Sequence, residues 1–335
     1  MPVIARVTMR DVAQAVGVSP MTVSRALRDD KTVSERTRSR VRAVAAELGY
    51  VYDTTAQAFR TQKSGFVAVT LPSVNNANFA DTFRGLSEAM AGSGMQILLG
   101  ATNYRLEKEE ELIRQLLTRN PEALVLTGGN HTDATRSLIR ARGLPVIEMW
   151  DLPPDPLGHV VGFSNADAMA ALVAHLAASG RRRLAFVGAS EGADLRGAER
   201  RASVVATARK LGLDEVAVID AGPAPVSMRH GAAAVERLGA RLSAFDALVC
   251  VSDTVAFGAL SECRRMRIDV PGQLAITGFG HFDVAAVSDP RITTVDVSAR
   301  LIGTEVARVL ETVFAGASAP LEIEVAARLV PGETS

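Results

Sequence analysis

From residue 65 onward, short apolar runs alternate with helical stretches. The runs are, in order, FVAVTL, MQILLGA, ALVLTG, PVIEMW, HVVGFSN, RRLAFVGA, EVAVID, ALVCVSD and LAITGFG. Apolar runs without polar alternation are typical of strands that are buried on both faces, and strands separated by helices pair in parallel. The pattern therefore predicts a doubly wound α/β fold. A chain of 335 residues is long enough for two or three domains, so residues 65–335 are expected to form two such lobes.

The prolines at 153, 154 and 156 mark the expected first crossing between the two lobes, and residues 280–300 mark the return. Lobe 1 is then expected to contain about 65–160 and 282–298. Lobe 2 is expected to contain about 161–281 and 299–335. Residues 50–64 are polar and nearly free of branched apolar side chains, which is typical of a linker between this core and an N-terminal domain of residues 1–49.

Residues 1–49 carry three helical signals at close spacing. Thr8, Ser19 and Ser34 each stand where an N-cap is expected, and apolar residues follow each of them at helical spacing. Gly17 ends the first helix, which leaves a turn of three or four residues before the second. Two helices joined by a short turn with a glycine predict a helix-turn-helix head, so the expected fold is an all-α head on an α/β core.

The net charge of zero hides an uneven distribution. The whole chain has 37 basic and 37 acidic residues. Residues 1–65 contain 11 basic and 6 acidic residues, a balance of +5, so the remainder holds 26 basic and 31 acidic residues, a balance of −5. A basic head on an acidic body indicates a nucleic-acid partner for the head.

The second helix of the head is expected to enter the major groove of DNA. In such a helix the N-terminal residues reach base edges, and caps and hydroxyls hold phosphates. Arg25 is placed for a bidentate contact with guanine. The alternative is an ordinary three-helix bundle with solvated arginines. The residues expected to contact DNA are Thr8, Ser19, Pro20, Met21, Thr22, Ser24 and Arg25.

Several classes of protein are disfavoured. No run approaches 18 apolar residues and the N-terminus lacks an apolar signal core, so neither a membrane span nor export is expected. Cys250 and Cys263 make no disulfide framework, which favours a reducing cytoplasm. The five histidines have neither metal-ligand nor catalytic spacing, and no phosphate-binding glycine motif is present. We therefore expect no metal, no cofactor and no enzymatic activity.

The chain resembles the lactose-repressor family of bacterial transcription regulators. The resemblance rests on VTMRDVAQAVGVSPMTVSRAL, VSERTRSRVRAVAAELGY, TTAQAF, GFSNADA, VSDTVAFGAL and the stretch from GFGHFD to DPRITTVD. Within it, LPSVNNANFAD, VIEMWDLPP with VGFSN, and VPGQLAITGFG resemble the gluconate-operon repressors. The resemblance implies a homodimer, a DNA-binding head, a hinge helix, and a two-lobed core similar to periplasmic sugar-binding proteins.

By the same resemblance, the linker becomes a hinge helix that folds on operator DNA. Ala56 and Gln57 match the small and polar positions of the family's hinge. Phe59 stands where the family commonly has a leucine that wedges into the minor groove. A phenylalanine is also able to intercalate and kink a base step. Docking of Phe59 against the core is the alternative.

A small effector is expected in the cleft between the lobes, at the carboxyl ends of the strands. Arg200 aligns with the family's effector-binding arginine, and its planar fork suits a carboxylate. The alternative for Arg200 is a surface ion pair within the run 196–201. Trp150 either stacks on a sugar face or packs in the core. The candidates that follow strands are Ser73, Asn75, Asn78, Phe79, His131, Glu148, Trp150, Asp151, Ser164, Asn165, Ser252, Asp253, Gly280 and His281.

Two departures from the family favour an anionic effector. Sugar-binding relatives often have aspartates where this chain has Gly280 and Ser164, and the loss of two acids lowers the repulsion of a carboxylate. We therefore expect a repressor that a sugar acid such as gluconate releases from a palindromic operator. The alternatives are a regulator that responds to a neutral sugar or a nucleobase, and a solute-binding protein. No heptad tail follows residue 330, which favours a dimer over a tetramer.

Overall fold

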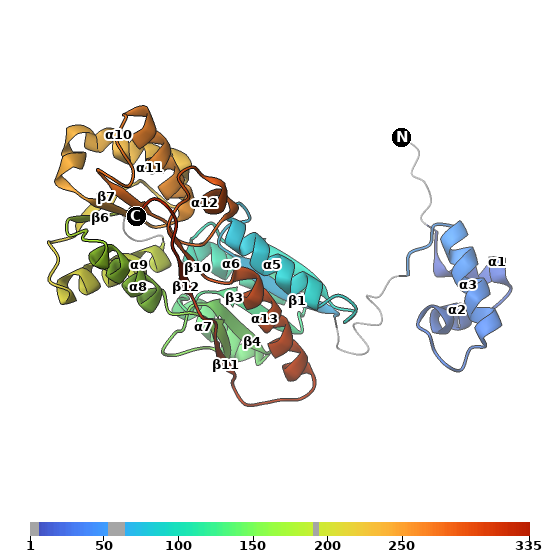
Figure 1. Cartoon of the computed structure of the whole chain (residues 1–335). Helices are drawn as coiled ribbons and strands as arrows, with labels where there is room; N and C mark the ends of the chain where they lie inside the picture. The colour runs from blue at the N-terminus through green and yellow to red at the C-terminus, as the bar shows by residue number, and fades with distance from the viewer. Residues whose placement is uncertain (1–6, 53–63, 190–193) are drawn as a thin grey trace. The chain divides into compact units, whose positions relative to one another are not determined.

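The computed structural model describes residues 7–52, 64–189 and 194–335. The chain divides between Ser64 and Gly65 into two compact units, and each has its own hydrophobic core (Figure 1). The expected start of the core at residue 65 coincides with this division. The hinge positions Ala56, Gln57 and Phe59 lie outside the described residues. Within the described ranges, no helix is long and apolar enough to cross a membrane.

The N-terminal unit, called the head below, contains three short helices. They are α1 (Met9–Val16), α2 (Pro20–Leu27) and α3 (Glu35–Glu47). Each helix contributes one valine without exposed surface to the shared core, namely Val12, Val23 and Val41. Three helices of this length supply only a small core, so the head depends on well-formed caps as well as on burial.

The caps of the head helices stand where the sequence predicts them. Ser19 Oγ accepts the backbone N–H of Thr22 at 3.1 Å, and Ser34 Oγ accepts that of Thr37 at 3.3 Å. Gly17 ends α1 at φ 76°, a left-handed conformation that glycine adopts without steric cost. The expected helix-turn-helix layout is confirmed.

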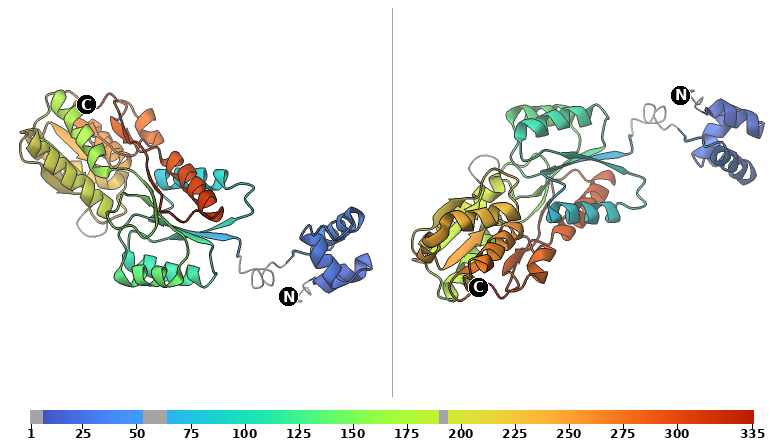
Figure 2. Two further views of the ribbon diagram at one scale, coloured as in Figure 1. Left: turned by 90° about the horizontal axis from the view of Figure 1, so that it is seen from below. Right: turned by 90° about the horizontal axis from the view of Figure 1, so that it is seen from above.

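Lobe 1 of the core is built on a six-stranded sheet whose neighbouring strands are all parallel. The spatial order is β11 (Glu322–Glu324), β5 (His159–Gly162), β4 (Val146–Trp150), β3 (Ala123–Thr127), β1 (Phe66–Leu71) and β2 (Gln96–Ala101). Helices α6 (Leu106–Leu117) and α7 (Asp133–Arg142) cover one face, and α5 (Ala77–Ala89) and α13 (Ala299–Phe314) cover the other (Figure 2). Burial on both faces explains why these strands lack polar alternation.

Lobe 2 has a four-stranded parallel sheet in the order β7 (Ala217–Asp220), β6 (Leu184–Gly188), β8 (Ala247–Cys250) and β9 (Ala275–Thr277). Helix α8 (Asn165–Ala178) packs on α9 (Leu195–Lys210), and α10 (Met228–Leu238) packs on α11 (Asp253–Arg265). Two further helical segments are η1 (Gly239–Ala244) and α12 (Asp283–Val287). The predicted fold class, a helical head on two doubly wound parallel-sheet lobes, is confirmed.

The structure corrects the expected lobe boundaries near the C-terminus. Residues 282–293 stay with lobe 2, because α12 packs on α11 and Thr293 bridges Thr277 of β9. Helix α13 and strand β11, expected in lobe 2, belong to lobe 1. Strand β10 (Thr294–Asp296) precedes α13 and β11 in the chain, and strand β12 (Arg328–Val330) follows them. The two strands pair antiparallel with each other. The final residues then return to lobe 2, where Thr334 Oγ1 bonds to the carbonyl of Ile276.

Close packing of α13 on α5 is the physical reason for this correction. A Cβ on Gly303 of α13 would lie 1.9 Å from the carbonyl oxygen of Thr82, and a Cβ on Gly85 of α5 would lie 2.2 Å from that of Arg300. Thr82 Oγ1 donates to the carbonyl of Ala299 at 2.9 Å. The two backbones approach so closely only because both contact positions are glycine. The apolar face of α13 does not by itself show which lobe it covers.

Candidate DNA-binding surface and effector cavity

The outer side of α2 carries the residues expected to read bases. Met21 is 59% exposed, and Pro20 and Arg25 are also exposed, whereas Val23 and Ala26 on the opposite side are buried. Arg25 forms no ion pair with any described residue. Its guanidinium is therefore available for a base edge, which is the geometry that a recognition helix requires.

The hydroxyl groups expected to hold phosphates lie around the start of α1 and α2. Ser19 Oγ and Thr22 Oγ1 are 2.9 Å apart and share a hydrogen bond, while the Thr8 hydroxyl bonds to a carboxylate in the first turn of α1. Ser24 Oγ lies 3.3 Å from Tyr52 Oη, a contact that the sequence did not predict. A hydroxyl both donates and accepts, so each retains capacity for a phosphate oxygen.

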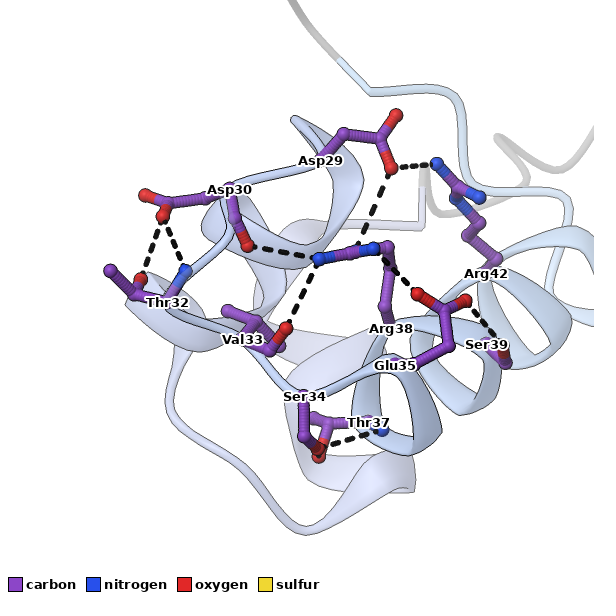
Figure 3. Close-up of polar contacts among 10 residues, drawn as sticks. All are labelled: Asp29, Asp30, Thr32, Val33, Ser34, Glu35, Thr37, Arg38, Ser39 and Arg42. Carbon is purple, nitrogen blue, oxygen red and sulfur yellow. Dashed lines mark hydrogen bonds and ion pairs between the residues drawn. The ribbon is translucent and has the colours of Figure 1, made fainter.

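Arg38, which the sequence analysis missed, ties the loop 29–34 to α3 (Figure 3). Its Nη2 donates to two carbonyls of the loop at 3.2 and 3.1 Å, and its Nη1 pairs with Glu35 at 2.6 Å. Asp29 lies 3.6 Å from Arg38 Nε and also pairs with Arg42. The Arg38 side chain is only 17% exposed, so it stabilises the head and does not face solvent as a DNA contact would.

Six other basic residues in the described part of the head form no ion pair there. No ion pair within the described residues involves Arg10, Arg25, Arg28, Lys31, Arg36 or Arg40, although Arg28 Nε donates to the carbonyl of Ser24. Arg36 and Arg40 are exposed and lie one turn apart on α3. Among its described arginines, the head therefore has two that pair with carboxylates, Arg38 and Arg42, and a larger set available to phosphates.

The core has a cavity at the carboxyl ends of the strands of both lobes. Lobe 1 lines it with Asn76, Asn78, Phe79, Tyr104, Trp150 and Phe163. The segment before α12, which stays with lobe 2, contributes Phe282. Lobe 2 lines it with Asn165, Asp194, Arg196, Arg200, Ala224, Pro225, Val226, Val251, Ser252, Thr254 and Phe279. Aromatic walls with a few polar groups are typical of a small-molecule site.

Six of the fifteen residues proposed from sequence for the effector line this cavity. They are Asn78, Phe79, Trp150, Asn165, Arg200 and Ser252. They come from helices and strand ends far apart in the chain, and the shared edge of parallel sheets brings them together. The other nine do not line it, namely Ser73, Asn75, His131, Glu148, Asp151, Ser164, Asp253, Gly280 and His281.

Helix capping and loop anchoring account for several residues outside the cavity. Ser164 caps α8 by accepting the N–H of Asp167, and Ser73 accepts that of Asn75. Asp253 is buried and accepts a hydrogen bond from the N–H of Phe282 at 2.7 Å, and burial raises its pKa to about 6. These groups position the loops that surround the cavity. His281 is half-exposed, 3.8 Å from a carboxylate oxygen of β10.

His131 and Glu148 belong to a separate buried cluster on the α6 side of lobe 1. His131 Nδ1 lies 2.7 Å from Glu109, and its Nε2 lies 3.2 Å from Glu148. Glu148 also accepts the N–H of Leu157 at 2.6 Å. Burial alone would lower the pKa of His131, but the hydrogen bonds and charges of both carboxylates raise it to about 9. The cluster is a structural ion network within lobe 1.

Trp150 is packed among other aromatic rings. It lies between Phe79 and Phe163, with ring centroids 4.9 and 5.8 Å apart and interplanar angles of 70°. Trp150 is 4% exposed and has a φ of 83°, a strained conformation for a bulky residue. Its buried Nε1 has no partner among the described residues. An acceptor on a ligand would therefore satisfy this donor.

Arg200 places a positive charge in the cavity. Its guanidinium carbon lies 4.4 Å from the ring centroid of Phe279, and its Nε donates to the carbonyl of Arg196 at 3.2 Å. It is half-buried and forms no ion pair within the described residues, which argues against the alternative of a surface ion pair. Burial lowers the pKa of Arg200 below its usual range, yet arginine remains charged at neutral pH.

Three further residues line the cavity that were not predicted from sequence, namely Tyr104, Asp194 and Arg196. Tyr104 follows the second strand, so the rule applied to the other strand ends would have found it. Arg196 precedes Arg200 by one helical turn, which places both side chains on one face of α9. Asp194 is the N-cap of α9 and accepts the N–H of Gly197 at 3.1 Å, so a local capping signal marks its place but does not show that this helix start borders the cavity.

Comparison with known proteins identifies the family. Residues 8–53 match the model of bacterial regulatory proteins of the lacI family, and residues 173–335 match that of the periplasmic binding protein-like domain. The chain is 35% identical to the HTH-type transcriptional regulator GntR of Pseudomonas aeruginosa, over 93% of this chain and 90% of that protein. It is 30% identical to the regulator of the same name from Escherichia coli K12, over 98% of each.

A solved structure shows the same architecture. A LacI-family transcriptional regulator from Silicibacter pomeroyi superposes with a TM-score of 0.91 and 29% identity, over 98% of this chain and 99% of that one. The helix-turn-helix head and the two parallel-sheet lobes agree with these matches. The chain belongs to the LacI family of DNA-binding transcriptional repressors, and it is not an enzyme.

Proposed function

We propose that this repressor controls genes of sugar-acid catabolism and leaves its operator when gluconate or a closely related sugar acid binds in the cavity. The observation that carries the proposal is the Arg200 guanidinium, which has no ion-pair partner among the described residues, in a cavity that also holds asparagine and serine side chains. The relatives named GntR, and the stretches that resemble gluconate-operon repressors, support the same effector class.

The chemistry of the lining suits a polyhydroxy acid. A carboxylate pairs with the planar fork of Arg200 through two parallel hydrogen bonds. The side chains of Asn78, Asn165 and Ser252 supply donors and acceptors for hydroxyl groups. The aromatic residues provide apolar walls against the carbon chain. A charged group at one end and hydroxyls along the chain are the features of gluconate.

On DNA, we propose that the protein acts as a homodimer that places two α2 helices in successive major grooves of a palindrome. Pro20, Met21 and Arg25 read bases, while Thr8, Ser19, Thr22 and Ser24 hold phosphates. Ala56, Gln57 and Phe59 are proposed to form the hinge at the minor groove. Two heads of +5 each carry about +10, so operator affinity should fall steeply with salt through counterion release.

Release by an effector requires unequal affinity for two states of the repressor. In the proposed cycle, gluconate binds more tightly to the arrangement of lobes that does not hold both heads on one operator. Thermodynamic reciprocity then requires operator DNA to weaken gluconate binding by the same factor. The two binding reactions are therefore linked and need to be measured together.

The test combines calorimetry with operator binding. Gluconate titrated into the full-length dimer should give saturable heat, and fluorescence anisotropy should show release of a labelled operator over the same concentration range. No binding at millimolar gluconate would refute the sugar-acid proposal. The aromatic walls also suit a nucleobase, so titrations with glucose and with a nucleoside distinguish the alternative effectors.

A further inference from the structure

Arg196 lies between the main cavity and a second one beside it. Both cavities are lined by Arg196 and Tyr104. The second cavity extends into lobe 1, where Asp151, Thr127 and Asn130 border it. Arg196 belongs to α9 of lobe 2, so its side chain reaches across the cleft to the end of β4.

The contacts of Arg196 with lobe 1 are loose. Its Nη1 lies 3.8 Å from Asp151 Oδ2, within ion-pair range but beyond hydrogen-bond distance. Its guanidinium carbon lies 5.5 Å from the ring centroid of Phe79. Within the described residues, no hydrogen bond from the Arg196 guanidinium is found. A guanidinium has five N–H donors, so this one has unused capacity for an oxygen ligand.

Burial makes that unused capacity costly. The side chains of Arg196 and Asp151 are 12% and 21% exposed. A buried charged group without hydrogen bonds loses solvation that a distant ion pair only partly replaces. Asp151 accepts a long 3.5 Å hydrogen bond from Asn165 Nδ2 and a hydrogen bond from the backbone N–H of Gly129. The two charged groups therefore lie close to each other, but at a distance too long for a hydrogen bond between them.

We propose that Arg196 is a specificity-determining residue that exchanges Asp151 for the carboxylate of the effector. The carboxylate is held between Arg196 and Arg200, which lie one helical turn apart on the same face of α9. A neutral sugar offers no charge to displace Asp151 and leaves the existing ion pair in place. This inference rests on the proposed function and explains how the site selects an acid.

The exchange also has a structural consequence. The ion pair between Arg196 and Asp151 joins a helix of lobe 2 to the end of β4 in lobe 1. No other ion pair among the described residues makes this connection. When the effector takes Arg196, this link between the lobes is released. The charge of the effector is thereby coupled to the contact between lobes, and an uncharged analogue lacks that coupling.

The experiment measures gluconate and its uncharged analogue gluconamide by calorimetry on the full-length protein. Arg196→Gln should weaken gluconate binding about 10- to 100-fold, because the variant loses a charge-assisted contact. The same substitution should change gluconamide binding less than about threefold. Arg196→Lys should recover only part of the loss, because an ammonium lacks the planar fork. Arg209→Gln, at the exposed end of the same helix, is the matched control and should change neither affinity.

A second variant tests the exchange directly and does not depend on the amide. Asp151→Asn removes the competing carboxylate and should tighten gluconate binding about 3- to 10-fold. Asp155→Asn, at a carboxylate that pairs with Arg136 at the surface, is its control. Thermal unfolding of each variant verifies that it is folded.

The outcomes separate the two proposals. Equal losses for acid and amide in Arg196→Gln, or weaker gluconate binding in Asp151→Asn, would overturn the exchange while leaving gluconate as the effector. Failure of the unmodified protein to bind gluconate would overturn the proposed function itself. A selective loss in Arg196→Gln with a gain in Asp151→Asn supports both.

Discussion

The head and the cleft use arginine in opposite ways. Arg25 is exposed on α2, in one continuous stretch of sequence with the other residues expected to contact DNA. Arg196 and Arg200 are partly buried among aromatic rings and acids that come from both lobes. An arginine that binds a large polyanion such as DNA can be fully solvent-exposed. An arginine that selects one small acid needs a shaped and partly desolvated site.

The same contrast appears within the head. Arg25 and Arg38 are both arginines near the α2–α3 junction, but Arg38 is held by loop carbonyls and two carboxylates (Figure 3). The number of basic residues in the head therefore overstates the positive charge available to DNA, since some of these residues stabilise the fold. What an arginine does depends on its partners, and substitutions can test this residue by residue.

The largest expected effect is on the cleft. Arg200→Ala should weaken gluconate binding at least about 100-fold, because it removes a bidentate, charge-assisted contact worth about 3 kcal/mol. Operator affinity without gluconate should stay unchanged. Anisotropy titrations with and without gluconate measure both. If Arg200→Ala is released from the operator as readily as the unmodified protein, Arg200 does not bind the effector.

The next effect concerns the pH dependence of core stability. The pKa of His131 is about 9 in the folded protein, against 6.5 for an ordinary histidine. Protonated His131 therefore stabilises the core fully below pH 6.5, and this contribution is lost as pH rises through about 9. The difference is on the order of 3 kcal/mol.

Urea unfolding between pH 6 and 10 measures this loss. Glu148→Gln removes one of the two carboxylates that raise the pKa of His131, so the loss of stability should move to lower pH. His131→Gln should remove this part of the pH dependence. A pH profile identical in His131→Gln and the unmodified protein would show that the cluster does not hold a proton as described.

A smaller effect is expected at the recognition helix. Arg25→Ala should cost about 1 to 3 kcal/mol of operator affinity and relax the preference at one base position, because it removes a base contact. Arg38→Ala is the comparison, since it should speed hydrogen exchange in residues 29–47 by loosening the loop. A sequence profile that Arg25→Ala leaves unchanged would rule out base reading by Arg25.

The smallest effect is at a helix cap. Ser34→Ala should destabilise the head by about 1 kcal/mol, because the N–H of Thr37 loses its acceptor at the start of α3. Hydrogen exchange of residues 35–47 measures the loss, and the exchange of core residues is the internal control. Equal protection in both proteins would mean that water replaces the serine without cost.

Prediction from sequence succeeded where structure is local. The caps at Ser19 and Ser34, the turn at Gly17 and the parallel strands all depend on neighbours in the chain or on a simple repeat of apolar residues. It succeeded for six of the fifteen proposed effector residues, because strand ends of a doubly wound fold meet at one edge. It could not tell a strand-end residue that lines the cavity from one that caps a helix, as Ser164 does.

The sequence by itself determined the helix-turn-helix head, the α/β core, the family and the basic character of the head, because short-range periodicity and capping encode them. Only the tertiary structure decided that α13 belongs to lobe 1, that His131 and Glu148 form a network away from the cavity, and that Arg196 faces Asp151. These depend on which helix faces pack closely and on where the chain crosses between lobes. Both are set by contacts between residues far apart in the chain, which no local pattern records.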